Sequence, residues 1–304
     1  MAVPLTPWAE ELRRLFPNAR LAEPLARHTT FHIGGPADVF IAVENEERLG
    51  ALLRFAKERA LPSFLIGRGS NLLVRDGGIR GVVVRLEGEF ERIEFLEGAR
   101  VRAGAAVPLP QLVMACAERG LAGAEPLAGV PGTVGGGLVM NAGTRELEIG
   151  ALTRRVRIFD PERLEGRWLE APELSFAYRH SNLAGSMILV GELVLKAGEK
   201  RDILRRVQEQ QQRRLRTQPI HTFNVGSVFK NPPGHFAAKL IEEAGLKGLR
   251  QGGAKVSELH ANFIENDKGA SAADVLALIE AVRGKVRERF GVALELEVKV
   301  VGEA

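Results

Sequence analysis

The chain has 304 residues, of which 45% are hydrophobic and 26% are charged, and its mean hydropathy is −0.04. This composition excludes a collagen-like or wholly disordered chain, and the length suggests about two domains, each able to bury a core without a metal or a disulfide. The formal net charge of +4 suits anionic small molecules as well as nucleic acid.

Cysteine usage and hydropathy predict where the protein works. Cys116 is the only cysteine, so an intramolecular disulfide is impossible and we expect a reducing compartment. No run reaches the roughly 18 uninterrupted apolar residues of a membrane span. Residues 1–9 lack a basic segment followed by an apolar core, so we expect no signal peptide and a cytoplasmic location.

Residues 1–85 predict a first α/β subdomain. Apolar residues recur at helical spacing between 48 and 60 and predict a helix there. Short apolar or β-branched runs predict strands at 39–43, 64–66 and 81–86.

A second α/β subdomain is expected over 86–196. It begins with a strand at 101–104 and a helix over 108–119, which Gly120 ends. A long glycine-rich loop is expected from Gly123 to Gly143. Strands return at 156–160 and 187–195, and the second is apolar enough to be covered on both faces.

The sequence changes character after residue 196 and predicts a C-terminal domain over 197–304. Helices are expected at 201–216, 235–244 and 271–289, the last beginning with the capping pair Ser271 and Asp274. Apolar and polar residues then alternate from Val292 to Val300, which predicts a strand. We expect this strand to return toward the functional site.

Two glycine-rich loops are the first candidate sites. Residues 67–73 and 131–137, the second continuing to 141–143, both lie beside predicted strands. Glycine allows several backbone N–H groups to point into one concavity, which is how loops hold pyrophosphate oxygens, and Ser70 and Thr133 add hydroxyl donors. A tight turn or a close strand crossing explains one such loop equally well. Two in one chain favour a nucleotide or dinucleotide site.

Several common site signatures are absent. Neither loop fits G-x-G-x-x-G, and Gly284-Lys285 is not followed by Ser or Thr, so a Rossmann site and a P-loop are not predicted. No G-x-S-x-G occurs, which weakens a hydrolase. His28 and His32 lie among threonines and glycines, so we predict no metal site and expect a loop hydrogen bond or a ligand contact. Cys116 lies on an apolar helix stripe and is expected to be an inert core thiol.

Three polar side chains are further candidates. The guanidinium of Arg179, beside the only tyrosine, Tyr178, can hold a carboxylate by two bonds, although a surface arginine is the simpler interpretation. Ser227 is either an exposed catalytic hydroxyl or a turn residue. Glu297 lies on the polar face of the last strand, where a solvated carboxylate is the usual explanation. The basic helix over 201–216 could follow nucleic-acid phosphates, but it lacks aromatic residues, so a solvated helix face is favoured.

Taken in order, these motifs resemble the UDP-N-acetylenolpyruvoylglucosamine reductase (MurB) family of peptidoglycan synthesis. The resemblance spans roughly residues 28–302, and its specificity comes from the ordered set rather than from any one motif. The matching segments are Thr30–Ala37, Gly67–Leu73, Gly129–Gly136, Asn141–Gly143, Tyr178–Ser181, Gly226–Pro232, Ala244–Gly248, His260–Ile264 and Leu294–Val298.

The resemblance implies an α+β fold, with a two-subdomain FAD-binding fold of the vanillyl-alcohol oxidase type and a C-terminal α/β substrate domain. It also implies a reaction in which NADPH reduces non-covalently bound FAD, and the enolpyruvyl ether of UDP-N-acetylglucosamine is then reduced to UDP-N-acetylmuramate. We expect a monomer with no nucleic-acid partner and no membrane insertion. Another FAD-dependent oxidoreductase of the same fold, with a different substrate, is the alternative.

The resemblance also implies roles for individual residues. Arg179, Ser227 and Glu297 match the family's catalytic positions. The positions implied for FAD are Ile33, Gly67, Arg68, Gly69, Ser70, Asn71, Leu72, Pro131, Gly132, Thr133, Gly135, Gly136, Asn141, Gly143 and Arg214. The positions implied for substrate are Tyr178, Arg216, Asn231 and His260.

These residue types suit the implied chemistry. Hydride addition to the enolpyruvyl methylene carbon builds negative charge on the neighbouring carboxylate, and a fixed cation such as Arg179 stabilises that charge. Ser227 would deliver a proton to the α-carbon, and Glu297 would hold the carboxylate geometry or relay a proton.

The chain departs from the family pattern in four places. Thr144-Arg145-Glu146 replaces a smaller run after Asn141–Gly143. Thr217 replaces a lysine that the family often carries, which removes one diphosphate contact or shifts it to Arg216. Phe223 stands where a proline is commoner. The segment after Arg179 is too short for the inserted tyrosine loop of the longer family form, so the chain resembles the shorter form.

Overall fold

The computed structural model describes residues 7–160 and 162–304. Residues 1–6, which are part of the segment predicted to contain no signal peptide, lie outside the described residues. Within the described ranges, no helix combines the length and the apolar character needed to cross a membrane.

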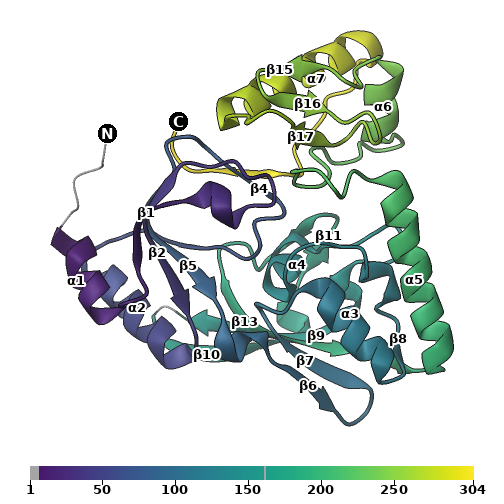
Figure 1. Ribbon diagram of the computed structural model, residues 1–304. Coiled ribbons are helices and arrows are strands. Elements are labelled where there is room, and N and C mark those ends of the chain that lie inside the picture. The colour runs from purple at the N-terminus through teal and green to yellow at the C-terminus, as the bar shows by residue number, and fades with distance from the viewer. Residues whose placement is uncertain (1–6, 161) are drawn as a thin grey trace.

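The first part of the chain forms a four-stranded sheet with two helices beside it (Figure 1). The strand order is β1-β2-β5-β3, in which β5 is parallel to β2 and β3, whereas β1 is antiparallel to β2. The elements are α1 (Pro7–Leu15), β1 (Arg20–Pro24), β2 (Pro36–Val43), α2 (Glu46–Glu58), β3 (Ser63–Leu65) and β5 (Ile79–Leu86). The predicted helix over 48–60 and the three predicted strands are confirmed. A short 3-10 turn, Leu25–His28, follows β1.

The second part forms a five-stranded antiparallel sheet with the order β10-β9-β13-β7-β6. Its strands are β6 (Ile93–Leu96), β7 (Arg100–Gly104), β9 (Thr153–Asp160), β10 (Glu165–Glu170) and β13 (Met187–Val194). The helix α3 (Leu109–Glu118) confirms the helix predicted over 108–119. The apolar run of β13 is explained by its place inside the sheet, where it pairs with β9 on one side and β7 on the other.

The predicted loop from Gly123 to Gly143 is wrong, because it contains a 3-10 turn (Glu125–Leu127) and the helix α4 (Val134–Met140). The Thr133 hydroxyl caps α4 by accepting a hydrogen bond from the Gly136 amide at 3.4 Å. A Cβ on Gly135 would lie 2.9 Å from the side chain of Ala105, so the low intrinsic helix propensity of glycine is overridden by close packing. Asn141 ends the helix in the left-handed region at φ +46°.

The helix α5 (Lys200–Thr217) connects the second part to the C-terminal part and runs alongside α3 and β8 (Leu121–Ala122) (Figure 1). Its buried residues Ile203 and Val207 join the same core as α3. The sequence predicts that α5 belongs to the C-terminal domain over 197–304. In the structure, the apolar side of this helix packs on the second subdomain instead.

The C-terminal part has its own core of apolar residues. It contains α6 (Ala237–Glu243), a sheet of β15 (Arg250–Gln251), β16 (Ala254–Val256) and β17 (Ile264–Asn266), and α7 (Ala272–Phe290). Ser271 and Asp274 form the predicted capping box at the start of α7. Phe31, Ile33 and Leu73 from the first part also pack in this core.

The end of the chain returns to the first part. The strand β18 (Lys299–Val301) pairs in parallel with β4 (Leu72–Val74), directly after the first glycine loop (Figure 1). The regular strand is shorter than the alternation from Val292 to Val300 predicts, because the residues before it pair only through an isolated bridge between Leu296 and Phe229.

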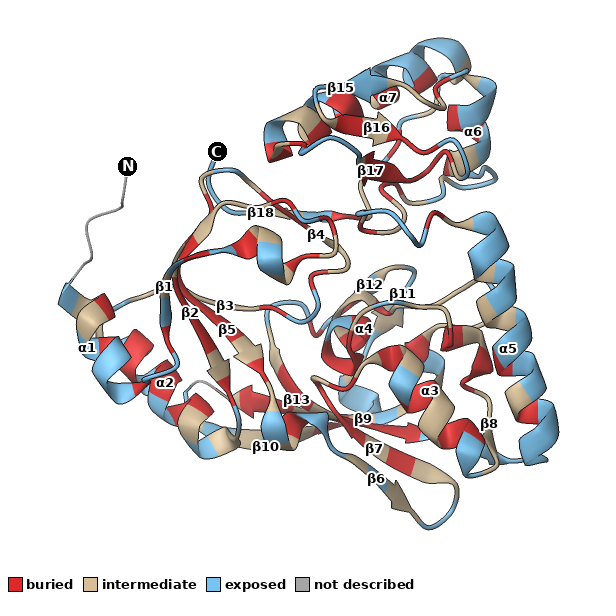
Figure 2. Cartoon of the chain, in the orientation of Figure 1, coloured by how far each residue is buried: buried red, intermediate tan, exposed pale blue. Residues whose placement is uncertain are grey.

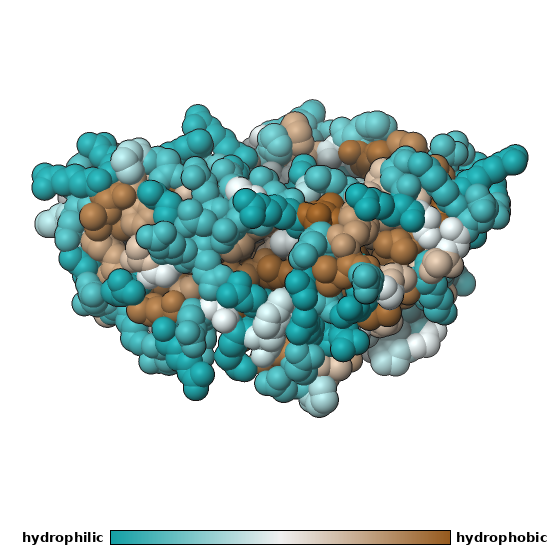
Figure 3. Space-filling model, turned by 90° about the horizontal axis from the view of Figure 1, so that it is seen from below, coloured by the Kyte–Doolittle hydropathy of each residue, from teal (hydrophilic) through white to brown (hydrophobic). Residues whose placement is uncertain are grey.

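Buried residues concentrate in the central strands β2, β5 and β13 and on the inner sides of the helices (Figure 2). The face seen from below, opposite the C-terminal part, is mostly hydrophilic, with hydrophobic patches showing between the polar side chains (Figure 3). The shorter elements are β8 with its partner β14 (Lys196–Ala197), β11 (Phe176–Ala177), β12 (His180–Ser181) and the 3-10 turns Gly88–Glu91, Ile149–Leu152 and Ala171–Glu173.

Candidate active site

A cavity of about 1380 Å³ lies between the three parts of the molecule. It is larger than the roughly 300–1,000 Å³ of a typical small-molecule pocket, so a dinucleotide and a second ligand can share it. Its walls come from both glycine loops, the start of α4, the turn at 178–179, and segments 225–231 and 297–301.

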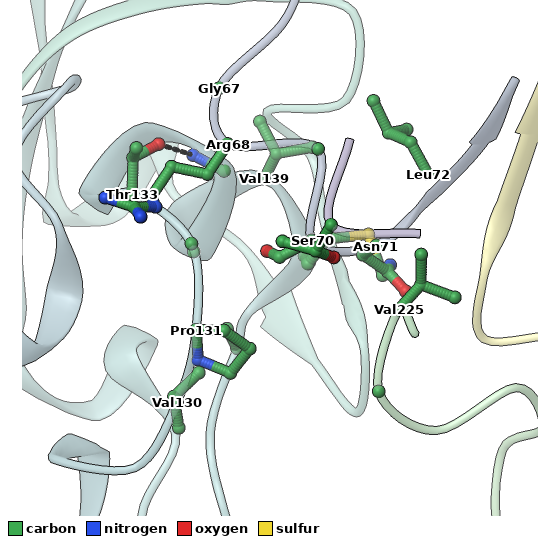
Figure 4. A pocket seen from close by; sticks show the side chains of 18 of the residues that line it. Gly67, Arg68, Ser70, Asn71, Leu72, Val130, Pro131, Thr133, Val139 and Val225 are labelled. Atoms are coloured by element: carbon green, nitrogen blue, oxygen red, sulfur yellow. Dashed lines mark hydrogen bonds between the residues drawn. The ribbon is translucent and has the colours of Figure 1, made fainter. Parts of the chain in front are cut away.

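The two glycine loops face each other across one end of the cavity (Figure 4). A Cβ on Gly67 would lie 2.8 Å from the Thr133 hydroxyl, and a Cβ on Gly132 would lie 2.7 Å from the Ser70 hydroxyl. Gly132 also has φ +103°, which an L side chain rarely adopts. Glycine at these positions therefore permits a close approach of the two loops and leaves their hydroxyls beside the cavity.

The first loop presents unused hydrogen-bond donors. Within residues 7–160 and 162–304, no backbone N–H from Gly67 to Asn71 donates to a backbone carbonyl. Buried N–H groups need an acceptor, and successive free N–H groups of this kind bind anions.

Arg214 adds a cation to the same cavity. Burial lowers the pKa of its guanidinium, which donates to the carbonyl of Gly129 and, at 2.8 Å, to the Gln218 side chain. No carboxylate in the described part of the chain forms an ion pair with it. A partly buried cation in the same cavity as the free donors of the first loop favours an anionic ligand.

Arg179 also lines the cavity, from the two-residue turn between β11 and β12. Its φ of +55° is unusual for a residue with a side chain, and such a conformation persists only where the surroundings hold it. Its Nε donates to Glu297 Oε1 at 2.8 Å, its Nη1 to Glu148 Oε1 at 3.3 Å, and its Nη2 to the Gly143 carbonyl at 3.1 Å. The surface-arginine interpretation is wrong, because the side chain is only 15% exposed.

Glu297 is not the solvated carboxylate that its place on a polar strand face suggests. Its side chain is 15% exposed and pairs with Arg179. Burial raises the pKa of Glu297, and the nearby Arg179 guanidinium only partly offsets this effect. A carboxyl group with a raised pKa can hold or accept a proton closer to neutral pH than an exposed one.

Ser227 reaches the same wall of the cavity from a third segment. The next residue, Val228, donates its N–H to the Asn262 carbonyl at 2.9 Å and accepts from the Glu297 amide at 2.8 Å. The Asn262 side chain also accepts from the Phe229 amide at 3.0 Å. These bonds fix Ser227 beside the segment that carries Glu297, just before β18.

Most of the other residues implied for cofactor or substrate also line the cavity. They are Gly67, Arg68, Gly69, Ser70, Asn71, Leu72, Pro131, Gly132, Thr133, Gly135, Gly136, Gly143, Arg214, Tyr178, Asn231 and His260. Burial lowers the pKa of His260, whose ring meets Phe263 edge-on at 4.7 Å. Tyr178 is half exposed, and its hydroxyl accepts from the Asn231 amide at 3.4 Å.

Three of the implied residues do not line the cavity. Ile33 is buried in the core of the C-terminal part, and Asn141 turns its side chain into the protein. Arg216 is exposed. The helix α5 continues through Thr217, and the face of α5 that lines the cavity carries Arg213, Arg214 and Thr217 instead. The diphosphate contact that the sequence shifts to Arg216 thus has no support from its position.

The two remaining histidine candidates, His28 and His32, also line the cavity. His28 lies 2.9 Å from a Glu23 carboxylate oxygen and stacks on Phe40, so the hydrogen bond is present and the ligand contact stays a prediction. Burial raises the pKa of Cys116 to about 12, as expected of an inert thiol. Within the described ranges, no three His, Cys, Asp or Glu side chains gather as a metal site requires.

Sequence reasoning missed Glu148, the second carboxylate on Arg179. It lies 31 positions from Arg179, in a segment without a recognisable motif. Its only signal is its place a few residues after the Asn141–Gly143 segment. Sequence reasoning also missed Lys299, which lines the cavity two residues beyond Glu297.

Comparison with known proteins supplies two family matches. Residues 37–161 match a family described as FAD binding domain, and residues 218–301 match one described as UDP-N-acetylenolpyruvoylglucosamine reductase, C-terminal domain. Together they confirm the predicted fold class, an FAD-binding fold followed by a C-terminal domain.

Individual relatives resemble nearly the whole chain. UDP-N-acetylenolpyruvoylglucosamine reductase 2 of Symbiobacterium thermophilum is 46% identical over 98% of both chains. The Moorella thermoacetica reductase of that name is 46% identical over 92% of both chains. The crystal structure of the Thermus caldophilus reductase superposes with a TM-score of 0.79 at 40% identity, covering 93% of this chain and 97% of the other.

Proposed function

The chain belongs to the UDP-N-acetylenolpyruvoylglucosamine reductase family, and from this premise we propose that it reduces the enolpyruvyl ether of UDP-N-acetylglucosamine to UDP-N-acetylmuramate. We further propose that NADPH is the reductant and that FAD binds non-covalently. The product would be a precursor of peptidoglycan. The convergence of Arg179, Ser227 and Glu297 at one wall of the cavity carries this proposal.

The residues at the glycine loops fit FAD. Its pyrophosphate would lie against the free N–H groups of residues 67–71, with Arg68 and Arg214 nearby as cations. A side chain at Gly67 or Gly132 would fill the space between the two loops. Without one, phosphate oxygens can come close to the backbone of both loops. The flavin of bound FAD supplies the two-electron chemistry.

Reduction of the enolpyruvyl double bond adds a hydride to the methylene carbon and a proton to the carbon that bears the carboxylate. Negative charge builds on that carboxylate in the transition state, and Arg179 is the cation that would face it. Three of the five guanidinium N–H groups are used by protein acceptors, which leaves two for the substrate carboxylate.

Ser227 would hold the proton that reaches the substrate α-carbon. A hydroxyl is a weak acid, so it serves only when the acceptor is an electron-rich enolate. Glu297, whose raised pKa favours its protonated form, would restore that proton or hold the substrate carboxylate in place. The same wall thus supplies both the cation and the proton.

The decisive experiment separates the two halves of the reaction. The purified protein is reduced anaerobically with NADPH, and flavin absorbance is followed in stopped flow after addition of the enolpyruvyl sugar nucleotide. We expect rapid reoxidation by this compound. If the reduced flavin were not reoxidised by it, the alternative, an FAD enzyme of the same fold with another substrate, would replace the proposal.

Ser227→Ala tests the proton-transfer role. We expect flavin reduction by NADPH to stay near the wild-type rate and reoxidation by the enolpyruvyl compound to slow by about 10²–10⁴-fold, the usual contribution of a positioned acid. Equal losses in both half-reactions would contradict this role.

The nucleic-acid alternative has little structural support. Three of the arginines of α5 are already paired with carboxylates, Arg205 with Glu209, Arg206 with Glu125 and Arg213 with Glu146. A yellow protein after purification, without bound nucleic acid, is the expected observation. The cytoplasmic location and the monomeric state stay predictions from the sequence.

A further inference from the structure

Glu148 is the least explained charged group near the proposed reaction centre. It follows the Asn141–Gly143 segment and precedes the 3-10 turn Ile149–Leu152. Its Oε1 accepts from Arg179 Nη1 at 3.3 Å, and its Oε2 accepts from the Asn141 side-chain amide at 2.7 Å. Each carboxylate oxygen therefore has its own donor.

Asn141 links this carboxylate to β11, the strand that ends two residues before Arg179. The side chain is buried, with only 2% of the residue exposed, and its amide also donates to the Ala177 carbonyl at 2.9 Å. Its own oxygen accepts from the Gly150 amide at 3.0 Å. Both side-chain donors of Asn141 and one acceptor site of its oxygen are thus bonded inside the protein.

The guanidinium of Arg179 is consequently held on three sides. Glu297 takes Nε, the Gly143 carbonyl takes Nη2, and Glu148 takes Nη1. Glu297 is itself proposed to take part in the chemistry, so its bond to Arg179 changes when substrate enters or a proton moves. Glu148 is the carboxylate that can stay in place during those events, because Asn141 fixes its second oxygen.

We propose that Glu148, fixed by Asn141, is a positioning residue that holds the Arg179 guanidinium at the place where substrate charge develops. The inference rests on the proposed function, and it reassigns Asn141 from the cofactor contact that the resemblance implies to the support of Arg179. Misplacement of a reacting or stabilising group by about 1 Å can cost up to about 100-fold in rate.

Glu148 has a second, electrostatic effect. One guanidinium stands between two carboxylates, and the charge of Glu148 contributes to the raised pKa of Glu297. Removing that charge lowers the pKa of Glu297, so the pH profile of the half-reaction that depends on it moves toward lower pH. A residue that only supported the fold would not move this profile.

The test compares Glu148→Ala, Glu148→Gln and a matched control, Glu46→Ala. Glu46 is also part of a carboxylate–arginine pair, with Arg157 at 2.6 Å, and its side chain is 26% exposed against 29% for Glu148. It does not line the large cavity. The readouts are FAD content, flavin reduction by NADPH, reoxidation by the enolpyruvyl sugar nucleotide over a pH range, and the crystallographic position of Arg179.

We expect Glu148→Ala to slow reoxidation by about 10- to 100-fold with reduction changed less than about twofold, and to displace the guanidinium from Gly143. Glu148→Gln keeps an oxygen for Arg179 but places an amide against the Asn141 amide, so we expect a smaller loss and a pH profile moved to lower pH. Glu46→Ala should leave both half-reactions unchanged.

Two results would overturn the inference. One is wild-type reoxidation and an unmoved guanidinium in Glu148→Ala; the other is an equal loss of both half-reactions in Glu148→Gln together with an unmoved pH profile. Failure of the wild-type protein to reoxidise with the sugar nucleotide would instead reject the proposed function, so the two failures are distinguishable.

Discussion

Two clusters of charged side chains in this molecule have opposite compositions. At the cavity, one arginine, Arg179, stands between two carboxylates, Glu148 and Glu297. In the five-stranded sheet, one carboxylate, Glu192, stands among four arginines, which are Arg100, Arg102, Arg154 and Arg155. Both clusters contain the same residue types, and they differ in which charge is in excess.

The difference appears in the protonation of the carboxylates. Burial raises the pKa of Glu192, but hydrogen bonds from Arg102 and Arg155 outweigh burial and hold its pKa below the usual value. At the cavity, burial wins and the pKa of Glu297 is raised, because a single guanidinium is shared by two carboxylates. Where arginines outnumber the carboxylate, as around Glu192, the carboxylate stays charged and stabilises the sheet. Where carboxylates outnumber the arginine, as around Arg179, a carboxyl group is left that can exchange a proton.

The largest expected effect comes from removing the arginine of the cavity cluster. Arg179→Ala should slow flavin reoxidation by about 10²–10³-fold, because a donor aimed at developing charge is lost. Stopped-flow absorbance measures this rate. Unfolding by urea should show a modest loss of stability, because Glu148 and Glu297 lose a shared donor. Alanine keeps a Cβ, so the strain of the positive φ stays in the variant. A large loss of stability with an unchanged rate would reverse the contrast between the two clusters.

The next effect concerns the sheet cluster. Glu192→Gln should reduce the free energy of unfolding by about 1.5–3 kcal/mol at pH 7, because hydrogen bonds to a charged group are lost inside the protein. Both half-reactions should proceed at wild-type rates.

The sign of its pH dependence follows from the lowered pKa of Glu192. The stability that this carboxylate contributes is fully present above the usual value of 4.5 and is lost as pH falls through the lower folded-state value. The difference in the free energy of unfolding between the wild type and Glu192→Gln should therefore become smaller in acid. Urea unfolding from pH 7 down to about 3 checks this, and a gap that widened in acid would contradict it.

The smallest expected effect is the pH dependence of stability that Glu297 contributes, which has the opposite sign to that of Glu192. Because the pKa of Glu297 is raised in the folded protein, the unfolded chain releases this proton at a lower pH than the folded protein does. The stability of the wild type therefore falls as the pH rises from the usual value of 4.5 through the folded-state pKa. Glu297→Gln does not titrate. It should thus gain stability relative to wild type across that window, by on the order of 1 kcal/mol. A relative loss over the same pH range would show that Arg179, not burial, dominates.

Local patterns in the sequence were enough to predict most of the longer elements. Apolar periodicity located α2, α3 and α7, the basic run located α5, and apolar or β-branched runs located β2, β5 and β13. The failure at α4 has a physical cause, because the low helix propensity of Gly135, Gly136 and Gly137 hides a helix that only close packing stabilises.

The charged clusters show why the rest was not predictable from the residues alone. Arg179 and Glu297 are 118 positions apart, and the motifs that mark each of them say nothing of their bond. Glu192 occurs in an apolar run, and its arginines come together only when β7, β9 and β13 pair. Family resemblance pointed to Arg179, Ser227 and Glu297, which line one cavity, but it gave no sign of Glu148.

The parallel pairing of β18 with β4 has a consequence for the order of events during synthesis. Asn71, directly before β4, donates to the carbonyl of Glu297 across 226 positions. A ribosome must therefore translate both subdomains and the long α7 helix before the wall that carries this carboxylate can form. The nascent protein can shape its glycine loops early, but the wall that carries Glu297 forms only after residues 297–301 have been synthesised.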